Sequence, residues 1–309
     1  MERPRAPTEN HSLFKRMVSQ SIYADGPEVQ ALQSAAQETQ TYLSIGISEK
    51  TRYSVGTLFN SNIMIGPDGR VLNLHRKLMP TFFEKLTWAP GDGHGLKVVE
   101  TPFGNIGNLI CGENTNPLAR YSLIAQAEQL HISTWPAVWP TRVADPGTAQ
   151  DPDAKNYDNV AANRIRAAAH CFEAKVFGVL CSGHLDEAAI ETIANGATDM
   201  EHITNMLRTS QRGATMFLDP TGAPTPGFTV DSETGEKNEA EFLQKEEGIL
   251  YADLKLADCV EGKQYHDVVG GYQRHDVFKL TVNRERQVPI RFLDPPARAE
   301  QKGEDADIA

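Results

Sequence analysis

Cysteine is scarce in this sequence, and its placement follows no framework. The 309 residues contain four cysteines, at positions 111, 171, 181 and 259, and no two of them have C-x-x-C spacing. This arrangement argues against a disulfide scaffold and against structural zinc, so we expect reduced thiols in a cytoplasmic protein. The sequence also lacks internal repeats, an apolar signal-peptide core and an apolar run of membrane-spanning length.

The chain has fewer positively than negatively charged residues. Lys and Arg number 30 against 41 Asp and Glu, which gives a formal net charge of −11. With no basic patch interleaved with aromatic residues, this balance argues against nucleic acid or an anionic membrane as a partner. Apolar residues make up 40% of the chain, enough for a well-buried core. We expect one domain over residues 1–290 and a disordered acidic tail over 291–309.

Strand and helix patterns alternate along the chain. Turn residues join two pairs of β-rich segments into hairpins, and apolar residues at helical spacing follow each region of strands. The expected strands cover residues 42–47, 57–65, 71–75, 96–100, 105–110, 131–135, 176–181, 214–218, 249–254 and 277–282. The expected helices cover 12–21, 27–39, 117–130, 157–172 and 186–208. This alternation predicts an α/β layered fold.

One cysteine lies where an apolar strand meets a helix. The segment from 103 to 117 reads FGNIGNLICGENTNP, with a buried strand over 105–110 and Pro117 suited to the first position of a helix. Cys111 therefore lies at a strand-to-helix bend. There the unpaired N–H groups of a helix start would favour the thiolate, which is the nucleophilic form. Taken alone, a cysteine in an apolar run is usually an inert core residue.

A long loop precedes this segment and carries two charged candidates. Residues 77–93 read KLMPTFFEKLTWAPGDG, where proline and glycine interrupt both strand and helix periodicity. Ordered loops of this length are usually functional. A cysteine that attacks a carbon bonded to nitrogen needs a cation for the developing negative charge and a group that moves protons. Lys77 and Glu84 in this loop could supply these services to Cys111.

Three spaced blocks resemble the nitrilase branch of the carbon-nitrogen hydrolase superfamily. They read HRKLMPTFFEKLTWAPGDG, GNLICGENTNPLARYSLIAQAEQLHISTWPAVWP and DNVAANRIRAAAHCFEAKVFGVLCSG. The resemblance implies a four-layer α-β-β-α sandwich that assembles into homodimers or longer spirals. It also implies hydrolysis of a small nitrile to a carboxylic acid and ammonia, without a metal or an organic cofactor.

The resemblance assigns roles to individual residues. Cys111 matches the family nucleophile, Lys77 the lysine that stabilises the tetrahedral intermediates, and Glu84 a second glutamate in the same pocket. The N–H of Gly112 would join Lys77 as a donor, and Trp135 would form part of the pocket wall. The family often has tryptophan where this chain has Gly112. The implied chemistry proceeds through a thioimidate and a thioester on the cysteine, and stopping one step early would release an amide.

The sequence departs from the family pattern at its start. The family begins with a strand, a helix and a second strand that ends in the general-base glutamate. This sequence shows no such segment, so we expect it to be N-terminally truncated relative to the family. Neither Glu2 nor Glu9 ends an apolar strand, and Glu113 does not match the base. Two alternatives to an active nitrilase therefore stay open. One is a catalytically impaired member that acts as a subunit or binding module, and the other is a cysteine-histidine hydrolase using His75 or His131.

Overall fold

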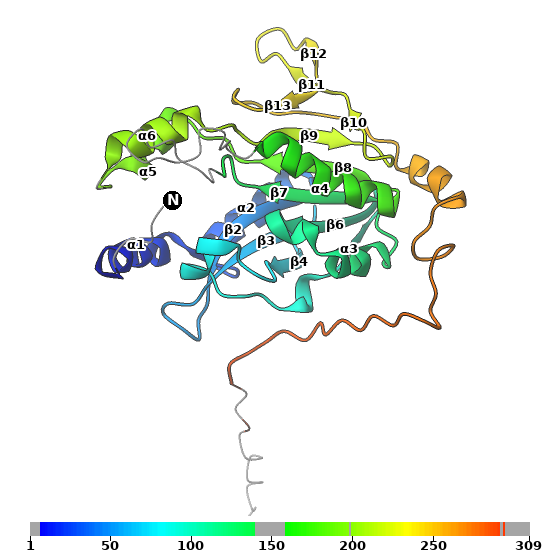
Figure 1. Ribbon diagram of the computed structural model, residues 1–309, viewed down its shortest axis with the longest axis horizontal. Coiled ribbons are helices and arrows are strands. Elements are labelled where there is room, and N and C mark those ends of the chain that lie inside the picture. Colours follow the sequence, from blue (N-terminus) through cyan, green and yellow to red (C-terminus); the bar gives the residue numbers. More distant parts are fainter. Residues whose placement is uncertain (1–6, 140–157, 198, 291–292, 294–309) are drawn as a thin grey trace, which may run out of the picture.

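Two stacked β-sheets, beside a small two-stranded hairpin, organise the described part of the protein (Figure 1). The computed structural model describes residues 7–139, 158–197, 199–290 and 293. The first sheet has the strand order β1-β2-β3-β4. Its strands are β1 (Ile22–Tyr23), β2 (Leu43–Lys50), β3 (Leu58–Ile65) and β4 (Val71–Arg76). The predicted hairpin between β3 and β4 is confirmed, and Gly69 adopts φ +76° in its turn, a conformation that glycine tolerates best.

The second sheet places three strand ends together. Its order is β10-β9-β8-β7-β6-β5, with β13 also paired to β9, and β6, β7 and β8 run parallel. Its strands are β5 (Val99–Thr101), β6 (Gly104–Ile110), β7 (Leu130–Trp135), β8 (Phe177–Ser182), β9 (Thr215–Leu218), β10 (Pro224–Thr225) and β13 (Phe242–Leu243). Ile110 pairs with Thr134, and Thr134 with Cys181. The residue after Ile110 therefore lies at the same edge of the sheet as the ends of β7 and β8, where α/β proteins usually bind ligands.

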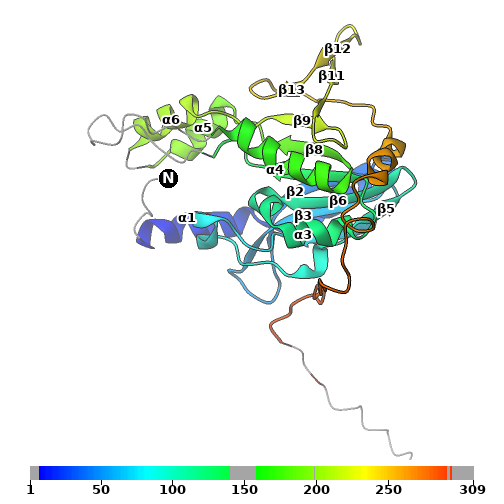
Figure 2. The same ribbon diagram turned by 45° about the vertical axis from the view of Figure 1, so that its right-hand side comes forward.

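Helices cover the outer faces of both sheets, as Figures 1 and 2 show. Helix α2 (Pro27–Thr39) packs Val29 and Ala36 against Ile63 and Ile65 of the first sheet. On the second sheet, α3 (Pro117–Ile124) buries apolar side chains against β6, and α4 (Asn159–Ala174) buries them against β8 and β9. The four-layer α-β-β-α sandwich is thus confirmed.

Several predicted boundaries are wrong. Helix α3 ends at Ile124, well before residue 130, and Ala127 beyond it adopts a left-handed φ of +58°. The expected helix over 186–208 is two helices, α5 (Glu187–Ala194) and α6 (Met200–Thr209), with Gly196 at φ +75° between them. Within 249–254 there is only one isolated bridge, from Tyr251 to Phe228, and 277–282 form no strand. Alternating apolar residues favour extended backbone, but a strand also needs a neighbouring strand to pair with.

The remaining elements of the described part belong to neither of these two sheets. They are α1 (Pro7–Gln20), the hairpin of β11 (Gly227–Val230) and β12 (Lys237–Ala240), and four 3₁₀ segments: η1 (Phe82–Leu86), η2 (Gly93–Gly95), η3 (Cys111–Thr115) and η4 (Leu256–Gln264). Apart from Leu293, the expected tail over 291–309 lies outside the described residues. Over the described ranges, no helix is both long and apolar enough to cross a bilayer.

Candidate active site

Cys111 occupies a strained turn at the end of β6. Its φ is +54°, in the left-handed region that costs a non-glycine residue free energy, and such conformations concentrate at functional sites. The predicted bend is confirmed, but the element that starts at Cys111 is the short 3₁₀ segment η3. The α-helix begins at Pro117, as expected, behind the cap of Asn116, whose side chain accepts from Leu118 and Ala119.

A buried glutamate ties this turn to the end of β4. The Glu113 carboxylate accepts from the N–H of Ile110 at 2.6 Å, the N–H of Leu78 at 2.9 Å and Nε2 of His75 at 2.5 Å. Burial alone would raise the pKa of Glu113, but His75 and the two backbone donors outweigh it and hold the pKa below its ordinary value. Glu113 is thus an anchored anion that fixes Lys77 relative to Cys111, in agreement with its exclusion as the base.

Lys77 and Glu84 form a partly buried ion pair. Nζ of Lys77, whose side chain is fully buried, lies 2.5 Å from Oε2 of Glu84 and 3.2 Å from Oγ1 of Thr81. The same Glu84 oxygen accepts from the Thr81 N–H at 2.6 Å, which caps the 3₁₀ segment η1. The structure therefore brings together two of the residues that the sequence singled out. Thr81 was missed, although a threonine three residues before a glutamate is a capping signal.

This ion pair lies beside the Cys111 turn. A side-chain Cβ at Gly112 would lie 3.1 Å from Thr81 Oγ1, so the two loops are in contact. Burial raises the pKa of the Cys111 thiol above its ordinary value, Lys77 and the Gly112 N–H lower it, and Glu84 raises it. The Gly112 N–H at this turn favours the thiolate, as the sequence predicts, but desolvation outweighs it together with Lys77, so the pKa of the thiol stays raised.

Trp135 lies at the same sheet edge, at the end of β7. It is 6% exposed, and the Arg166 guanidinium of α4 lies 5.5 Å from its ring centroid. Arg166 also lowers the pKa of Cys111, which places this guanidinium within electrostatic range of the thiol. Trp135 therefore lies near the Cys111 turn, at the same edge of the sheet.

The other groups that could act as a base do not face Cys111 as free partners. Glu2 and the side chain of Glu9 lie outside the described part of the chain. Glu49, near the end of β2, was not singled out by the sequence, and Arg76 donates to its carboxylate at 2.5 and 2.9 Å and Ser61 at 2.7 Å. His75 bonds Glu113, and its other ring nitrogen faces Gly95. Because His131 is likewise held by buried partners, the structure does not support a cysteine-histidine pair.

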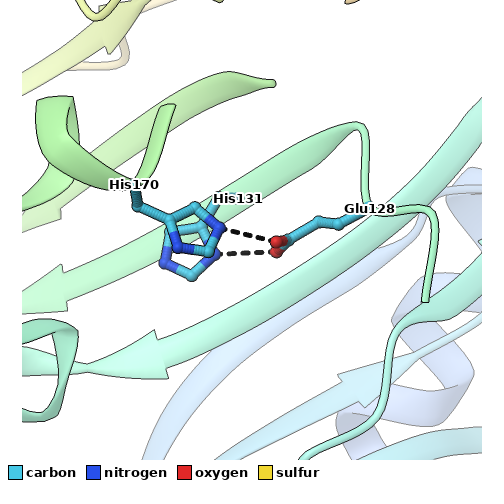
Figure 3. Close-up of side chains that lie close together, drawn as sticks. All are labelled: Glu128, His131 and His170. Atoms are coloured by element: carbon cyan, nitrogen blue, oxygen red, sulfur yellow. Dashed lines mark hydrogen bonds and ion pairs between the residues drawn. The ribbon is translucent and has the colours of Figure 1, made fainter. Parts of the chain in front are cut away.

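One group of side chains has the composition of a metal site. Glu128, His131 and His170 are buried, and their ligand atoms lie within 4.8 Å of one another. Figure 3 shows that each carboxylate oxygen of Glu128 faces one ring, at 2.7 Å from Nδ1 of His131 and 2.6 Å from Nε2 of His170. Direct hydrogen bonds thus already use the groups that would ligate an ion.

Comparisons with known proteins agree with this geometry. The pattern of the carbon-nitrogen hydrolase family matches residues 11–264. A nitrilase of Penicillium rubens is 31% identical, over 94% of this chain and 81% of that protein. A bromoxynil-specific nitrilase of Klebsiella pneumoniae subsp. ozaenae is 30% identical, over 97% and 78%. The carbon-nitrogen hydrolase of Helicobacter pylori G27 shares the fold with a TM-score of 0.58 at 18% identity, over 81% of this chain and 74% of that one. The chain belongs to the carbon-nitrogen hydrolase family, in its nitrilase branch.

Proposed function

We propose that this protein hydrolyses a small nitrile to a carboxylic acid and ammonia, with Cys111 as the nucleophile. The observation that carries the proposal is the contact between the strained Cys111 turn and the loop that holds the partly buried Lys77–Glu84 pair. A thiol, a cation and a carboxylate are the three groups that addition to a carbon–nitrogen triple bond requires. The nitrilases among the relatives support the choice of a nitrile.

The steps follow from these groups. The thiolate of Cys111 adds to the nitrile carbon, and the nitrogen takes up a proton to give a thioimidate. Water adds to that carbon, the nitrogen leaves as ammonia, and a thioester remains. A second water then releases the carboxylic acid and restores the thiol. Lys77 and the Gly112 N–H stabilise the charge that develops at each addition, and Glu84 transfers protons.

A second candidate function is a catalytically impaired member that acts as a subunit or binding module. The raised pKa of Cys111 favours it, because a buried thiol with no dedicated base is a weak nucleophile near neutral pH. Removing a general base typically slows a reaction by about 10² to 10⁴. This candidate predicts a folded protein that releases no ammonia from nitriles.

We further propose that the chain forms homodimers or longer spirals. The helical layer made by α5 and α6 presents apolar side chains to solvent, with Ile193 at 50% and Met200 at 56% exposure. Burying such residues between two copies would be favourable. Light scattering coupled to size-exclusion chromatography tests this, and a strictly monomeric protein at micromolar concentration would contradict it.

Ammonia release from a panel of aliphatic and aromatic nitriles tests the main proposal. Cys111→Ala should abolish release, whereas Cys181→Ala, which removes an exposed cysteine, should retain it. Product analysis by mass separates acid from amide. Release that survives in Cys111→Ala would contradict the assignment of the nucleophile, and no release from the wild type would favour the impaired subunit.

A further inference from the structure

A chain of buried polar side chains connects the Cys111 turn to the interior of the second sheet. Asn114 in η3, Glu128 in the loop before β7, His131 on β7 and His170 on α4 are each at most 2% exposed. Buried polar groups cost free energy unless they are hydrogen-bonded, so the direction of every bond here has consequences.

The carbonyl groups beside Asn114 fix the orientation of its amide. Nδ2 lies 2.9 Å from the carbonyl oxygen of Cys111 and 3.2 Å from that of Leu109. A carbonyl only accepts, so the NH₂ group must face these two atoms. Oδ1 is then an acceptor, and it lies 2.9 Å from Nε2 of His131 and 3.0 Å from Oγ of Ser133.

His131 therefore carries a proton on both ring nitrogens. Nε2 must donate to Asn114. Nδ1 lies 2.7 Å from Oε1 of Glu128, and although burial alone would raise the pKa of Glu128, His170 and His131 lower it to about 2. A carboxylate that is ionised only accepts, so Nδ1 donates as well and the ring is an imidazolium.

The second histidine completes the charge balance. His170 stacks on His131 with ring centroids 3.8 Å apart, and its Nε2 lies 2.6 Å from Oε2 of Glu128 (Figure 3). Burial and then the charge of His131 lower the pKa of His170. His170 is thus neutral, so the cluster holds one anion, the Glu128 carboxylate, and one cation, the His131 ring.

This chain acts on the nucleophile through a single peptide plane. The carbonyl of Cys111 and the N–H of Gly112 belong to the same planar peptide and point in opposite directions. The hydrogen bond from Asn114 to this carbonyl therefore points the Gly112 N–H away from Asn114. That N–H faces the Cys111 sulfur and lowers the pKa of the thiol. We propose that Asn114, His131 and Glu128 are positioning residues that hold the Cys111–Gly112 peptide so that its N–H serves the sulfur and the oxyanion.

The alternative occupant of this cluster is a metal ion. The hydrogen bonds disfavour it, because both nitrogens of His131 and both oxygens of Glu128 are already in use at 2.6 to 2.9 Å. The proposal rests on Cys111 as the reactive thiol of the proposed function and not on any substrate. It is therefore tested by alkylation of the thiol, which can succeed even if nitrile turnover fails.

The first test is nitrogen-15 NMR of the wild-type protein labelled at histidine. We expect one ring, assigned to His131 by its loss in His131→Gln, to show two protonated nitrogens at pH 7. A neutral ring at pH 7, or a stoichiometric metal ion that chelators remove with a change in this signal, would overturn the proposal.

The second test is the pH profile of iodoacetamide alkylation, resolved by peptide mass. In Asn114→Asp and His131→Gln, the midpoint for Cys111 should rise by about one pH unit, so that alkylation below it slows about tenfold. Cys181 in the same molecules is the internal reference, and His94→Gln removes an exposed histidine as the matched control. The other charges that face Cys111, namely Lys77, Glu84 and Arg166, are unchanged in these variants.

An unchanged Cys111 profile in both folded variants would overturn the proposal. Equal shifts of the alkylation midpoint at Cys111 and Cys181 would also overturn it, because they would indicate that the whole fold has loosened. If neither variant folds, the wild-type spectrum decides alone, because the absence of any doubly protonated histidine ring at pH 7 would overturn the proposal.

Discussion

Nζ of Lys77 lies 2.5 Å from Oε2 of Glu84, and the two side chains act on Cys111 with opposite sign. The lysine lowers the pKa of the thiol and the glutamate raises it. In the proposed mechanism, Lys77 therefore activates the nucleophile and Glu84 transfers protons. Because the two residues shift the pKa of the thiol in opposite directions, replacing each in turn distinguishes the two roles.

Replacing the cation should suppress the thiolate. In Lys77→Met the pKa of Cys111 should rise, so alkylation of Cys111 at pH 8 should slow, and nitrile turnover should fall by about 10² or more. Peptide-resolved alkylation beside an ammonia assay measures both. Lys263→Met removes a lysine remote from the site as a control, and unchanged alkylation in Lys77→Met would contradict the account.

Replacing the anion should have mixed effects. In Glu84→Gln, loss of the negative charge should lower the pKa of Cys111 and make alkylation faster at pH 7 to 8, while turnover falls by about 10² to 10⁴ for want of a proton-transfer group. The same two assays apply. If alkylation slows together with turnover, Glu84 supports the structure of the pocket and does not transfer protons.

The backbone strain at Cys111 predicts an unusual ranking of stabilities. Glycine tolerates φ +54°, so Cys111→Gly should be more stable than Cys111→Ala by about 0.5 to 1 kcal/mol. Urea unfolding measures the difference. In helix α4, by contrast, Ala161→Gly should destabilise the protein by about 1 kcal/mol. Equal stabilities of the two Cys111 variants would argue against a left-handed turn.

Two ion pairs of different burial should differ in their contribution to stability. Arg76 and Glu49 are 8% and 3% exposed, so Arg76→Ala leaves a buried carboxylate without its cation and should cost about 3 to 5 kcal/mol of unfolding free energy. The Arg208–Glu187 pair lies at the surface, and Arg208→Ala should cost less than about 1 kcal/mol. Similar losses of unfolding free energy in the two variants would contradict the conclusion that burial makes the Arg76–Glu49 pair more important for stability.

Acid should remove the stabilisation that Glu128 provides. Its pKa falls from 4.5 to about 2 on folding, so the stabilisation is complete above about pH 5 and is lost as the pH falls toward 2. The lowered pKa of His170 acts in the same direction, starting near its ordinary value of 6.5. The difference between wild type and Glu128→Gln in urea unfolding, on the order of 3 kcal/mol at pH 7, should shrink by pH 3. Glu239→Gln, at an exposed position, should show no such trend, and a difference independent of pH would contradict the prediction.

Patterns of adjacent residues predicted much of the fold, and the resemblance to a known family predicted part of the site. The hairpin turn at Gly66, the proline at the start of α3 and the strand before Cys111 are encoded in adjacent residues, and all are confirmed. The resemblance to nitrilases placed Lys77 and Glu84 in one pocket, and the structure joins them.

What sequence could not supply depends on contacts between distant segments. Glu128 and His170 are 42 residues apart, and the packing of α4 on β7 and β8 brings them together. Nor does a residue pattern indicate that desolvation of Cys111 exceeds the effect of Lys77, because the balance depends on burial in three dimensions.

Intact and peptide mass spectrometry of the protein quenched during reaction with a nitrile tests the central claim most directly. The account predicts a covalent adduct at Cys111, with the mass of a thioimidate or thioester, that is absent from Cys181 and appears together with free ammonia. Ammonia formed with no adduct at Cys111 under rapid quenching, or an adduct distributed equally over the exposed cysteine, would contradict Cys111 as the nucleophile.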